Sequence, residues 1–513
     1  MWYNEYTNKQ NTTKEDFNVF SLSQAYEQLS FEEQISKIGS LPLRNPEKFI
    51  ELLEKHFDLP TFIPQSFYYA YYNSTTNDRE YSLESMLSML LLMHFFHYAS
   101  VPNFVVLLTF SPKIQEFCRL PEGQIPDESC ISKFKTAFDR ELKALFDNMA
   151  LHVMNIFTEY NASLPDNSPK KGLSEEAIYD TSGLKPKVKE NNPKTVASEI
   201  KKQSKYKDYL LNNGDDRAKT FNVYEAAYAN LPKTASANPA IKLDYANGHF
   251  GYFYKFGIVS NGFGVPLHIH FLDDDFYKSL PDKFDSMEQQ KYTFDNASLC
   301  PVFSAFRKNI GNNKFTTFLG DSEFDSFDNY SFLNEFGFSK VVIPINPRNS
   351  KPQNVKIPKT DDGIPCCPKD DSDVFIAAGH CKGKNRSFRL KYVCPKSVNV
   401  KGKWSSSCDD KCRHTNSTVT SYVYPNADLR FFSGVQRGSV EWNRLYKRRS
   451  VIERSISSLK SHPSISFPKT YNTASLRSDV FLNATSKLIT VILAFALGHV
   501  NFLANLRKLL RVA

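Results

Sequence analysis

The chain has 513 residues, which is enough for two to four domains with hydrophobic cores. Its 64 Lys and Arg residues exceed its 55 Asp and Glu residues, so the formal net charge is +9 at pH 7. This excess is compatible with a polyanionic partner but is too small over this length to require one. Neither the ATP-binding pattern GxxxxGK[ST] nor a Gly-rich dinucleotide fingerprint occurs, so neither of these ligands is expected.

The N-terminal sequence MWYNEYTNKQNTTKEDF lacks a basic region followed by an apolar run. We therefore expect no secretory signal and a cytoplasmic protein whose nine cysteines are reduced. The most apolar stretch, KLITVILAFALGHVNFLANLRKLL at 487–510, is interrupted by polar residues, and there is no second span. We expect it to form a buried helix that packs on a sheet, with no membrane association.

Residues 1–170 are predicted to form an all-helical N-terminal domain. Residues 82–98 are apolar on all sides, which suits the central helix of a small bundle. Residues 126–157 follow with helical periodicity, and Asp127 or Ser129 is the expected N-cap. The Pro-, Ser- and Lys-containing segment 163–172 is the expected domain boundary.

Residues 171–346 alternate strand and helix signals and predict the first part of an α/β core. A short strand ends at Asp180, and a second one, Phe315 to Leu319, ends at Asp321. Residues 251–271 predict a hairpin in which Asn261-Gly262 supplies the positive φ of the turn. The further expected elements are a helix start at the acidic triplet Asp273 to Asp275, helices at 283–309 and 325–336, and a strand at 340–346.

Two segments interrupt this order. Residues 190–245 are polar and basic, and their KKQSKYK run at 201–207 is either a solvated face or a contact to a DNA backbone. Residues 347–439 form an insertion with six cysteines, which either bind structural zinc or are buried, inert thiols. These cysteines are Cys366, Cys367, Cys381, Cys394, Cys408 and Cys412, with His380 and His414 among them.

Residues 440–513 are predicted to be the helical end of the core, and they begin with RLYKRRSVIERSISSLK at 444–460. Tyr446, Arg449, Glu453 and Lys460 fall within an arc of roughly 60° on one helix. One interpretation is an amphipathic helix with a mixed-charge outer face. The other is a strip that holds a metal ion at Glu453 and phosphates on either side.

Asp180 and Asp321 would complete a set of three carboxylates with Glu453. Such a set holds two divalent ions in enzymes that transfer phosphoryl groups. A single Asp at a strand end is more often a turn residue or a helix cap, so the prediction depends on the three contexts together.

These motifs resemble those of the DDE transposases of bacterial insertion sequences, in the group with a Tyr-x2-Arg-x3-Glu-x6-Lys signature. Tyr446, Arg449, Glu453 and Lys460 match the signature without a gap, and YDTSGL and GDSEFDSFDNYSFL resemble the two segments that carry the catalytic aspartates. The resemblance runs from about residue 80 to the C-terminus.

The resemblance implies a ribonuclease-H-like catalytic core, interrupted by the Cys-containing insertion and preceded by a helical domain that binds the ends of the element. It also implies that Asp180, Asp321 and Glu453 are catalytic and bind two Mg²⁺ or Mn²⁺ ions, and that Tyr446, Arg449 and Lys460 bind DNA. The expected partners are the transposon ends and the target DNA, bound by a homodimer. The alternatives are a catalytically inactive DNA-binding relative and a zinc-organised interaction protein.

Overall fold

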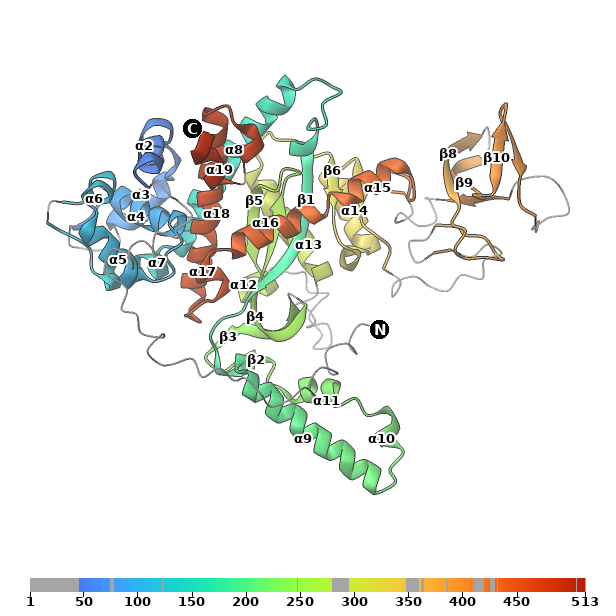
Figure 1. Cartoon of the computed structure of the whole chain (residues 1–513), viewed down its shortest axis with the longest axis horizontal. Coiled ribbons are helices and arrows are strands. Elements are labelled where there is room, and N and C mark those ends of the chain that lie inside the picture. The colour runs from blue at the N-terminus through green and yellow to red at the C-terminus, as the bar shows by residue number, and fades with distance from the viewer. Residues whose placement is uncertain are drawn as a thin grey trace, which may run out of the picture.

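The computed structural model describes residues 46–73, 78–121, 123–246, 248–278, 295–346, 359–360, 364–383, 386–409, 419–424, 430, 432–503 and 505–512. Its N-terminal part consists of the helices α2 (Pro46–His56), η2 (Leu59–Phe62), α3 (Gln65–Asn73), α4 (Leu83–Phe95), α5 (Val101–Phe110), α6 (Pro112–Phe117), α7 (Glu128–Ala137) and α8 (Asp139–Ser163). The helices α2 to α7 gather at one end of the molecule, and α8 runs from them toward its centre (Figure 1).

The apolar helix predicted at 82–98 is α4, and nearly all of its residues are buried. Ser82 caps it by accepting a hydrogen bond from the Ser85 amide. Asp127 caps α7 in the same way, as expected, by accepting from the Cys130 amide. The long helix predicted at 126–157 is two helices, because Phe138 leaves the helical conformation between α7 and α8.

A mixed sheet forms the centre of the molecule. Its strands are β1 (Glu176–Leu184), β2 (Thr234–Ala235), β3 (Asn238–Ala246), β4 (His249–Ser260), β5 (Pro266–Phe271), β6 (Thr317–Leu319) and β7 (Lys340–Val342). The order is β2-β3-β4-β1-β6-β7, and β5 also pairs with β4. β4 is antiparallel to β1, β3 and β5, whereas β6 is parallel to β1 and to β7.

Helices cover both faces of the sheet. The helices that follow β5 and β6 are α12 (Asp274–Lys278), α13 (Asp295–Asn309), η7 (Ser322–Phe324) and α14 (Phe327–Phe336). Phe303 of α13 packs on Tyr179 of β1 and Phe318 of β6, which places α13 on one face. Asp180 follows Tyr179 and therefore points to the opposite face, because side chains alternate along a strand.

The predicted hairpin is present as β4 and β5. Asn261 organises its turn by accepting from the amides of Phe263 and Val265. The expected positive φ at Gly262 is wrong, since Gly264 adopts it, with φ +78°. Gly262 is needed for another reason: a Cβ there would lie 2.5 Å from Oε2 of Glu176.

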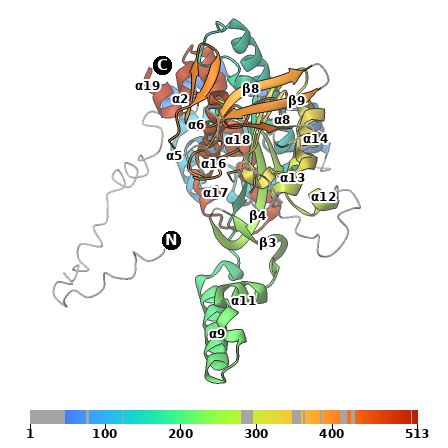
Figure 2. The same ribbon diagram turned by 90° about the vertical axis from the view of Figure 1, so that its right-hand side faces the viewer.

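The polar segment after β1 forms an arm of three helices, α9 (Pro193–Asn212), α10 (Arg217–Thr220) and α11 (Val223–Asn230). In two views the arm projects away from the sheet, beyond the ends of β3 and β4 (Figures 1 and 2). Leu210, Ala218 and Ala227 are buried between its helices, so the arm has a small core of its own.

The insertion forms a separate lobe far from the N-terminal helices (Figure 1). Its strands are β8 (Ile376–Gly383), β9 (Arg386–Val393), β10 (Ser397–Val400), β11 (Lys403–Ser406) and β12 (Thr420–Val423). β9 pairs with β8 and β12, and β10 pairs with β11. A small hydrophobic cluster that includes Cys367, Leu390 and Cys394 holds this lobe together.

The C-terminal elements are α15 (Val440–Lys447), α16 (Ser450–Lys460), α17 (Pro463–Ser466), α18 (Thr473–Ala496), η11 (Val500–Phe502) and α19 (Leu506–Val512). α18 is long and apolar enough to cross a membrane, but 83% of its apolar window is buried inside the molecule. It packs on α4, α7, α8 and β5. The expected buried helix is therefore confirmed, although residues 487–510 divide among α18, η11 and α19. The N-terminal helices and the sheet share one continuous core.

Candidate active site

Asp180 lies on β1, and Asp321 lies just beyond the end of the neighbouring parallel strand β6. Ile178 of β1 is in register with Leu319 of β6, and each Asp follows its strand residue by two positions. Extending this register by two residues puts both positions on the same face of neighbouring strands, which are spaced about 5 Å apart. The Asp321 carboxylate is close enough to raise the pKa of Asp180. The expected end of the strand at Asp180 is wrong, because β1 continues to Leu184 by pairing with β4. Asp321 does follow the end of β6, where it accepts from the Ser322 amide.

The helix α16 crosses this face of the sheet and packs on β1 and β4 (Figure 1). At its start, the Arg449 guanidinium lies between two of the predicted acids. One Nη is 2.7 Å from Glu453 Oε1, and the other is 3.4 Å from Asp321 Oδ2. These carboxylates raise the pKa of Arg449 although burial opposes the change. The structure thus brings Arg449, Glu453 and Asp321 together.

The single helix predicted over 444–460 is wrong in its middle. It is interrupted between α15 and α16, where the amides of Arg448 and Arg449 donate to carbonyls three residues back. Tyr446 therefore lies on α15, where its ring stacks on Trp442 at 5.1 Å. Such tight turns change the angle per residue, so the predicted arc does not hold across the junction.

Lys460 is the last residue of α16 and is partly buried. Burial lowers the pKa of its ammonium to about 8, and the nearby Asp180 carboxylate opposes this shift. Lys460 therefore lies near Asp180, while Arg449 and Glu453 lie toward Asp321. The helix presents its two cations at opposite ends of the acidic pair.

A buried ion pair attaches this helix to the sheet. Arg448 at the α15–α16 junction pairs with Glu176, the first residue of β1, which is 2% exposed. Burial raises the pKa of Glu176 to about 7, and Arg448 counteracts this shift. The pair fixes the position of the junction relative to β1, and hence that of Arg449 relative to the two aspartates.

A second polar network, absent from the sequence prediction, lies behind Asp180. Lys255 of β4 pairs with Asp295 at 2.7 Å and Asp244 at 3.2 Å, and Thr181 donates to Asp295. A hydrogen bond that the Glu323 carboxyl donates to Asp295, together with burial, raises the pKa of Glu323 to about 7. These residues are far apart in the sequence. The register of β1 against β4, which pairs Gly183 with Lys255, brings Lys255 to this part of β1.

The electrostatics of Asp180 fit a cation site. Burial raises its pKa to about 7, and the carboxylates of Asp295 and Asp321 add to this effect, whereas Arg449 opposes it. A divalent ion with oxygen ligands would relieve this accumulation of negative charge. Among the described residues, no three His, Cys, Asp or Glu side chains converge in a ready metal-binding group. Arg449 instead neutralises Asp321 and Glu453.

The insertion brings some of its thiols together. The pKa of Cys394 is raised by burial and by the proximity of Cys367 and Cys408. The described cysteines form no disulfide. Cys412 and His414, two further members of the predicted zinc set, lie outside the described residues.

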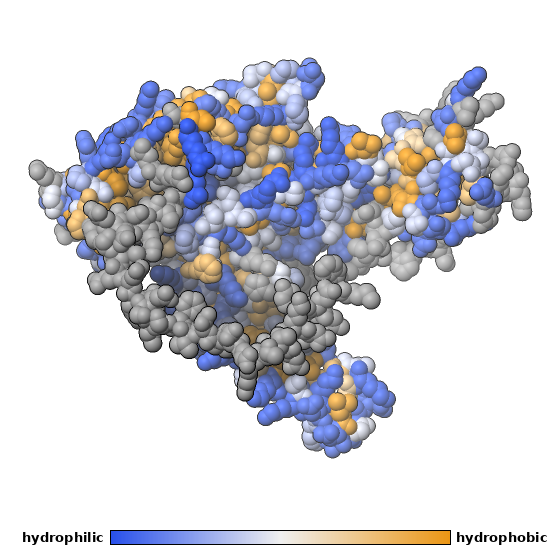
Figure 3. Space-filling model, viewed as in Figure 1, coloured by the Kyte–Doolittle hydropathy of each residue, from blue (hydrophilic) through white to orange (hydrophobic). Residues whose placement is uncertain are grey.

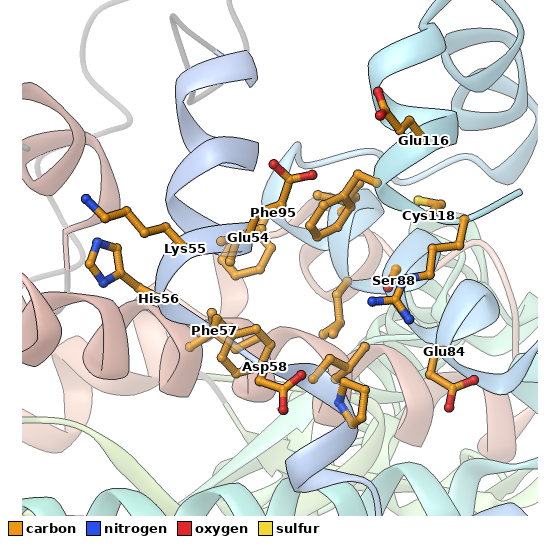
Figure 4. A pocket seen from close by; sticks show the side chains of 18 residues that line it. Glu54, Lys55, His56, Phe57, Asp58, Glu84, Ser88, Phe95, Glu116 and Cys118 are labelled. Atoms are coloured by element: carbon orange, nitrogen blue, oxygen red, sulfur yellow. The ribbon is translucent and has the colours of Figure 1, made fainter.

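A cavity of about 680 Å³ lies elsewhere, among the N-terminal helices (Figure 4). Polar side chains of α2 and α4, such as Lys55, His56 and Glu84, surround its apolar floor. None of the three predicted catalytic acids lines it, so it is distinct from the candidate site.

The helices around this cavity match a known family. Residues 41–137 match the family described as Transposase domain (DUF772). This transposase domain match covers α2 to α7 and supports a transposase family. No curated protein matches the chain at a significant level. The transposase domain is joined to the C-terminal helices through a buried ion pair between Lys135 and Asp479, 2.5 Å long.

Proposed function

We propose that this transposase is of the DDE type. It would cleave the ends of an insertion sequence and join the 3′ hydroxyls to target DNA. The observation that carries the proposal is the position of Asp180 and Asp321 on one face of the sheet, opposite Arg449 and Glu453. The transposase domain match in the same chain supports it.

A ribonuclease-H-like core is part of this proposal. In its support, three antiparallel strands, β5, β4 and β1, continue into the parallel strands β6 and β7. The helical region up to 170 would bind transposon ends, residues 171–346 and 440–513 would make up the catalytic core, and 347–439 would be an insertion. A cytoplasmic protein that dimerises on DNA completes the proposal.

Asp180, Asp321 and Glu453 would hold two Mg²⁺ or Mn²⁺ ions. Bound divalent ions supply Lewis acidity and neutralise charge that develops on phosphate oxygens. The protein itself would position the DNA: Arg449 and Lys460 donate to phosphates on either side of the acids, and Tyr446 contacts a phosphate or an unpaired base. Lys255, Asp295 and Thr181 would hold β1 in place behind Asp180.

Nicking of duplexes that carry the sequences flanking the gene tests the proposal. Wild type should nick them only with Mg²⁺ or Mn²⁺. Asp180→Asn, Asp321→Asn and Glu453→Gln should each lower nicking by about 10³-fold or more while sparing DNA binding. Asp328→Asn, an exposed carboxylate on α14, is the matched control.

The alternatives give other outcomes. DNA binding without metal-dependent nicking by wild type would indicate an inactive relative. Neither binding nor nicking would favour a zinc-organised interaction protein. Nicking that survives substitution of one acid would remove that residue from the site.

We also propose a structural zinc in the insertion, because Cys367 and Cys408 both lie close enough to Cys394 to raise its pKa. The described residues alone form no ready metal-binding group, and the further candidate ligands Cys412 and His414 lie outside them. The purified protein should then contain about one equivalent of zinc by elemental analysis. Cys394→Ser should lose it, whereas Cys118→Ala, a buried thiol among the N-terminal helices, should retain it. A zinc-free wild-type protein would identify these thiols as inert.

A further inference from the structure

The segment that leads from β1 into α9 is strongly basic. Residues 185–209 contain eight lysines, two glutamates and one aspartate. Both glutamates are engaged: Glu190 accepts from the Ser236 amide and hydroxyl, and Glu199 accepts from Lys202 and Gln203. Most of the positive charge is therefore not neutralised by this segment's own acids. We call residues 185–209 the basic arm.

The first part of the basic arm is extended. Lys185, Lys187 and Lys189 are exposed, while the intervening residues Pro186 and Val188 are buried. Alternate residues of an extended chain point to the same side, so three ammonium groups form a row. This row begins directly after β1, the strand that carries Asp180.

The second part continues the row along α9. Lys194, Lys201 and Lys205 are exposed and fall within an arc of about 40° over about 16 Å of helix. Within the described ranges, none of these three makes an ion pair. Leu210, on the opposite side of the helix, is buried where α9 meets α11. The lysine face of α9 therefore points to solvent.

Two tyrosines border this face. Tyr206 and Tyr209 are 43% and 62% exposed, and their rings lie nearly parallel with centroids 6.4 Å apart. Tyrosine hydroxyls also donate hydrogen bonds to DNA phosphates. Figure 3 shows the arm standing clear of the body, with hydrophilic residues around a small apolar patch.

We propose that the basic arm binds the phosphate backbone of double-stranded DNA that extends beyond the cleavage site. This inference rests on the transposase function proposed above and assigns it a second contact surface. A row of exposed lysines matches a regular array of phosphates, whereas a protein interface is usually depleted of lysine. The arm leaves the core at the end of β1, so DNA held at Asp180 can continue along it.

The test uses a fluorescein-labelled duplex of mixed sequence, about 40 base pairs long, with anisotropy measured between about 50 and 200 mM salt. The triple variant Lys194→Gln, Lys201→Gln, Lys205→Gln should bind on the order of tenfold more weakly at about 100 mM salt, and its slope of log K against log salt should fall by about two to three. Asp208→Asn, which removes an acid from the same face, should bind a few-fold more tightly.

Lys219→Gln is the matched control, because Lys219 lies on α10, outside the basic arm, and already pairs with Asp216 at 2.8 Å. Unchanged affinity and salt slope in the triple variant would overturn the inference. So would a triple variant that binds DNA normally but loses self-association in sedimentation, which would assign the arm to contacts between copies. If wild type neither binds nor nicks DNA, the transposase proposal fails as well. If wild type binds and nicks DNA and the triple variant binds it with the same affinity and salt slope, the arm proposal alone fails.

Discussion

The helix α16 and the basic arm both carry positive side chains at helical spacing, yet their surroundings are opposite. On α16, Arg449 is 20% exposed and contacts Asp321 and Glu453, while burial lowers the pKa of Lys460 to about 8. On α9, Lys201 and Lys205 are exposed and, within the described chain, make no ion pair. The same helical spacing of positive side chains therefore occurs on α16, where the cations face other protein groups, and on α9, where they face solvent.

The difference shows what helical spacing can and cannot indicate. Spacing determines which side chains share a face, but the packing of the helix determines what that face meets. A cation that becomes buried must find a carboxylate, whereas an exposed one is satisfied by water and is available to a polyanion. Variants that break the buried contacts of α16 should consequently have larger effects than equivalent changes on the arm.

The largest effect is expected at the pair that attaches α16 to the sheet. Arg448→Ala leaves the Glu176 carboxyl buried without its partner and should lower the free energy of unfolding by about 3 kcal/mol. Lys202→Ala, which breaks the exposed pair with Glu199 on the arm, should cost less than about 0.5 kcal/mol. Denaturant unfolding of both variants checks this, and equal losses would contradict the comparison.

At the acids themselves, Arg449→Ala should lower DNA nicking by about 10²-fold, because it removes the cation between Asp321 and Glu453. Arg449→Lys should restore only part of the activity, since a point charge cannot form two directed hydrogen bonds. Lys201→Ala on the arm should nick short duplexes at the wild-type rate. Wild-type nicking by Arg449→Ala would assign α16 to the scaffold.

Stability should depend on pH through Asp180. An unfolded aspartate ionises near pH 4, but the pKa of folded Asp180 is raised to about 7. The folded protein therefore holds one more proton between these values, and the metal-free unfolding free energy should fall as pH rises from about 4 to about 7. Asp180→Asn should lack this component, which is on the order of 3 kcal/mol. Parallel pH profiles for both proteins would contradict the prediction.

Lys460 should limit DNA cleavage at high pH. Because burial lowers the pKa of its ammonium to about 8, its positive charge is lost as pH rises through this value. Nicking should fall several-fold between about pH 7.5 and 9. Lys460→Arg, which stays charged, should move this decline to higher pH, and a profile that is identical in both proteins would exclude Lys460 as the cause.

The smallest effect is expected on the arm in the absence of DNA. Lys201→Gln should change the free energy of unfolding by less than about 0.5 kcal/mol, because its side chain is exposed and unpaired with any described residue. Thermal unfolding with and without duplex DNA separates a role of Lys201 in stability from a role in DNA binding. Duplex DNA should raise the unfolding temperature of wild type more than that of this variant. A large loss of stability without DNA would show that the arm lysines have structural partners.

Local patterns were enough to predict several elements correctly. The apolar run at α4, the Asp127 cap of α7 and the β4–β5 hairpin each depend on neighbouring residues alone. Two local details failed, the positive φ expected at Gly262 and the continuous helix expected over 126–157. Two other failures concern long-range partners. β1 extends past Asp180 because β4 pairs with it, and the helix at 444–460 is interrupted where Arg448 pairs with Glu176.

The sequence by itself determined the three acidic candidates and the basic residues near Glu453, because their spacing and neighbouring strand signals are local properties. Only the tertiary structure decided that Asp180 and Asp321 lie close together, since this depends on the register of β1 against β6. It likewise placed Lys255 and Asp295 behind Asp180 and left the lysines of α9 in solvent. Whether a charged side chain is buried, and which group it pairs with, depends on residues that are distant in the chain. Local spacing carries no information about those residues.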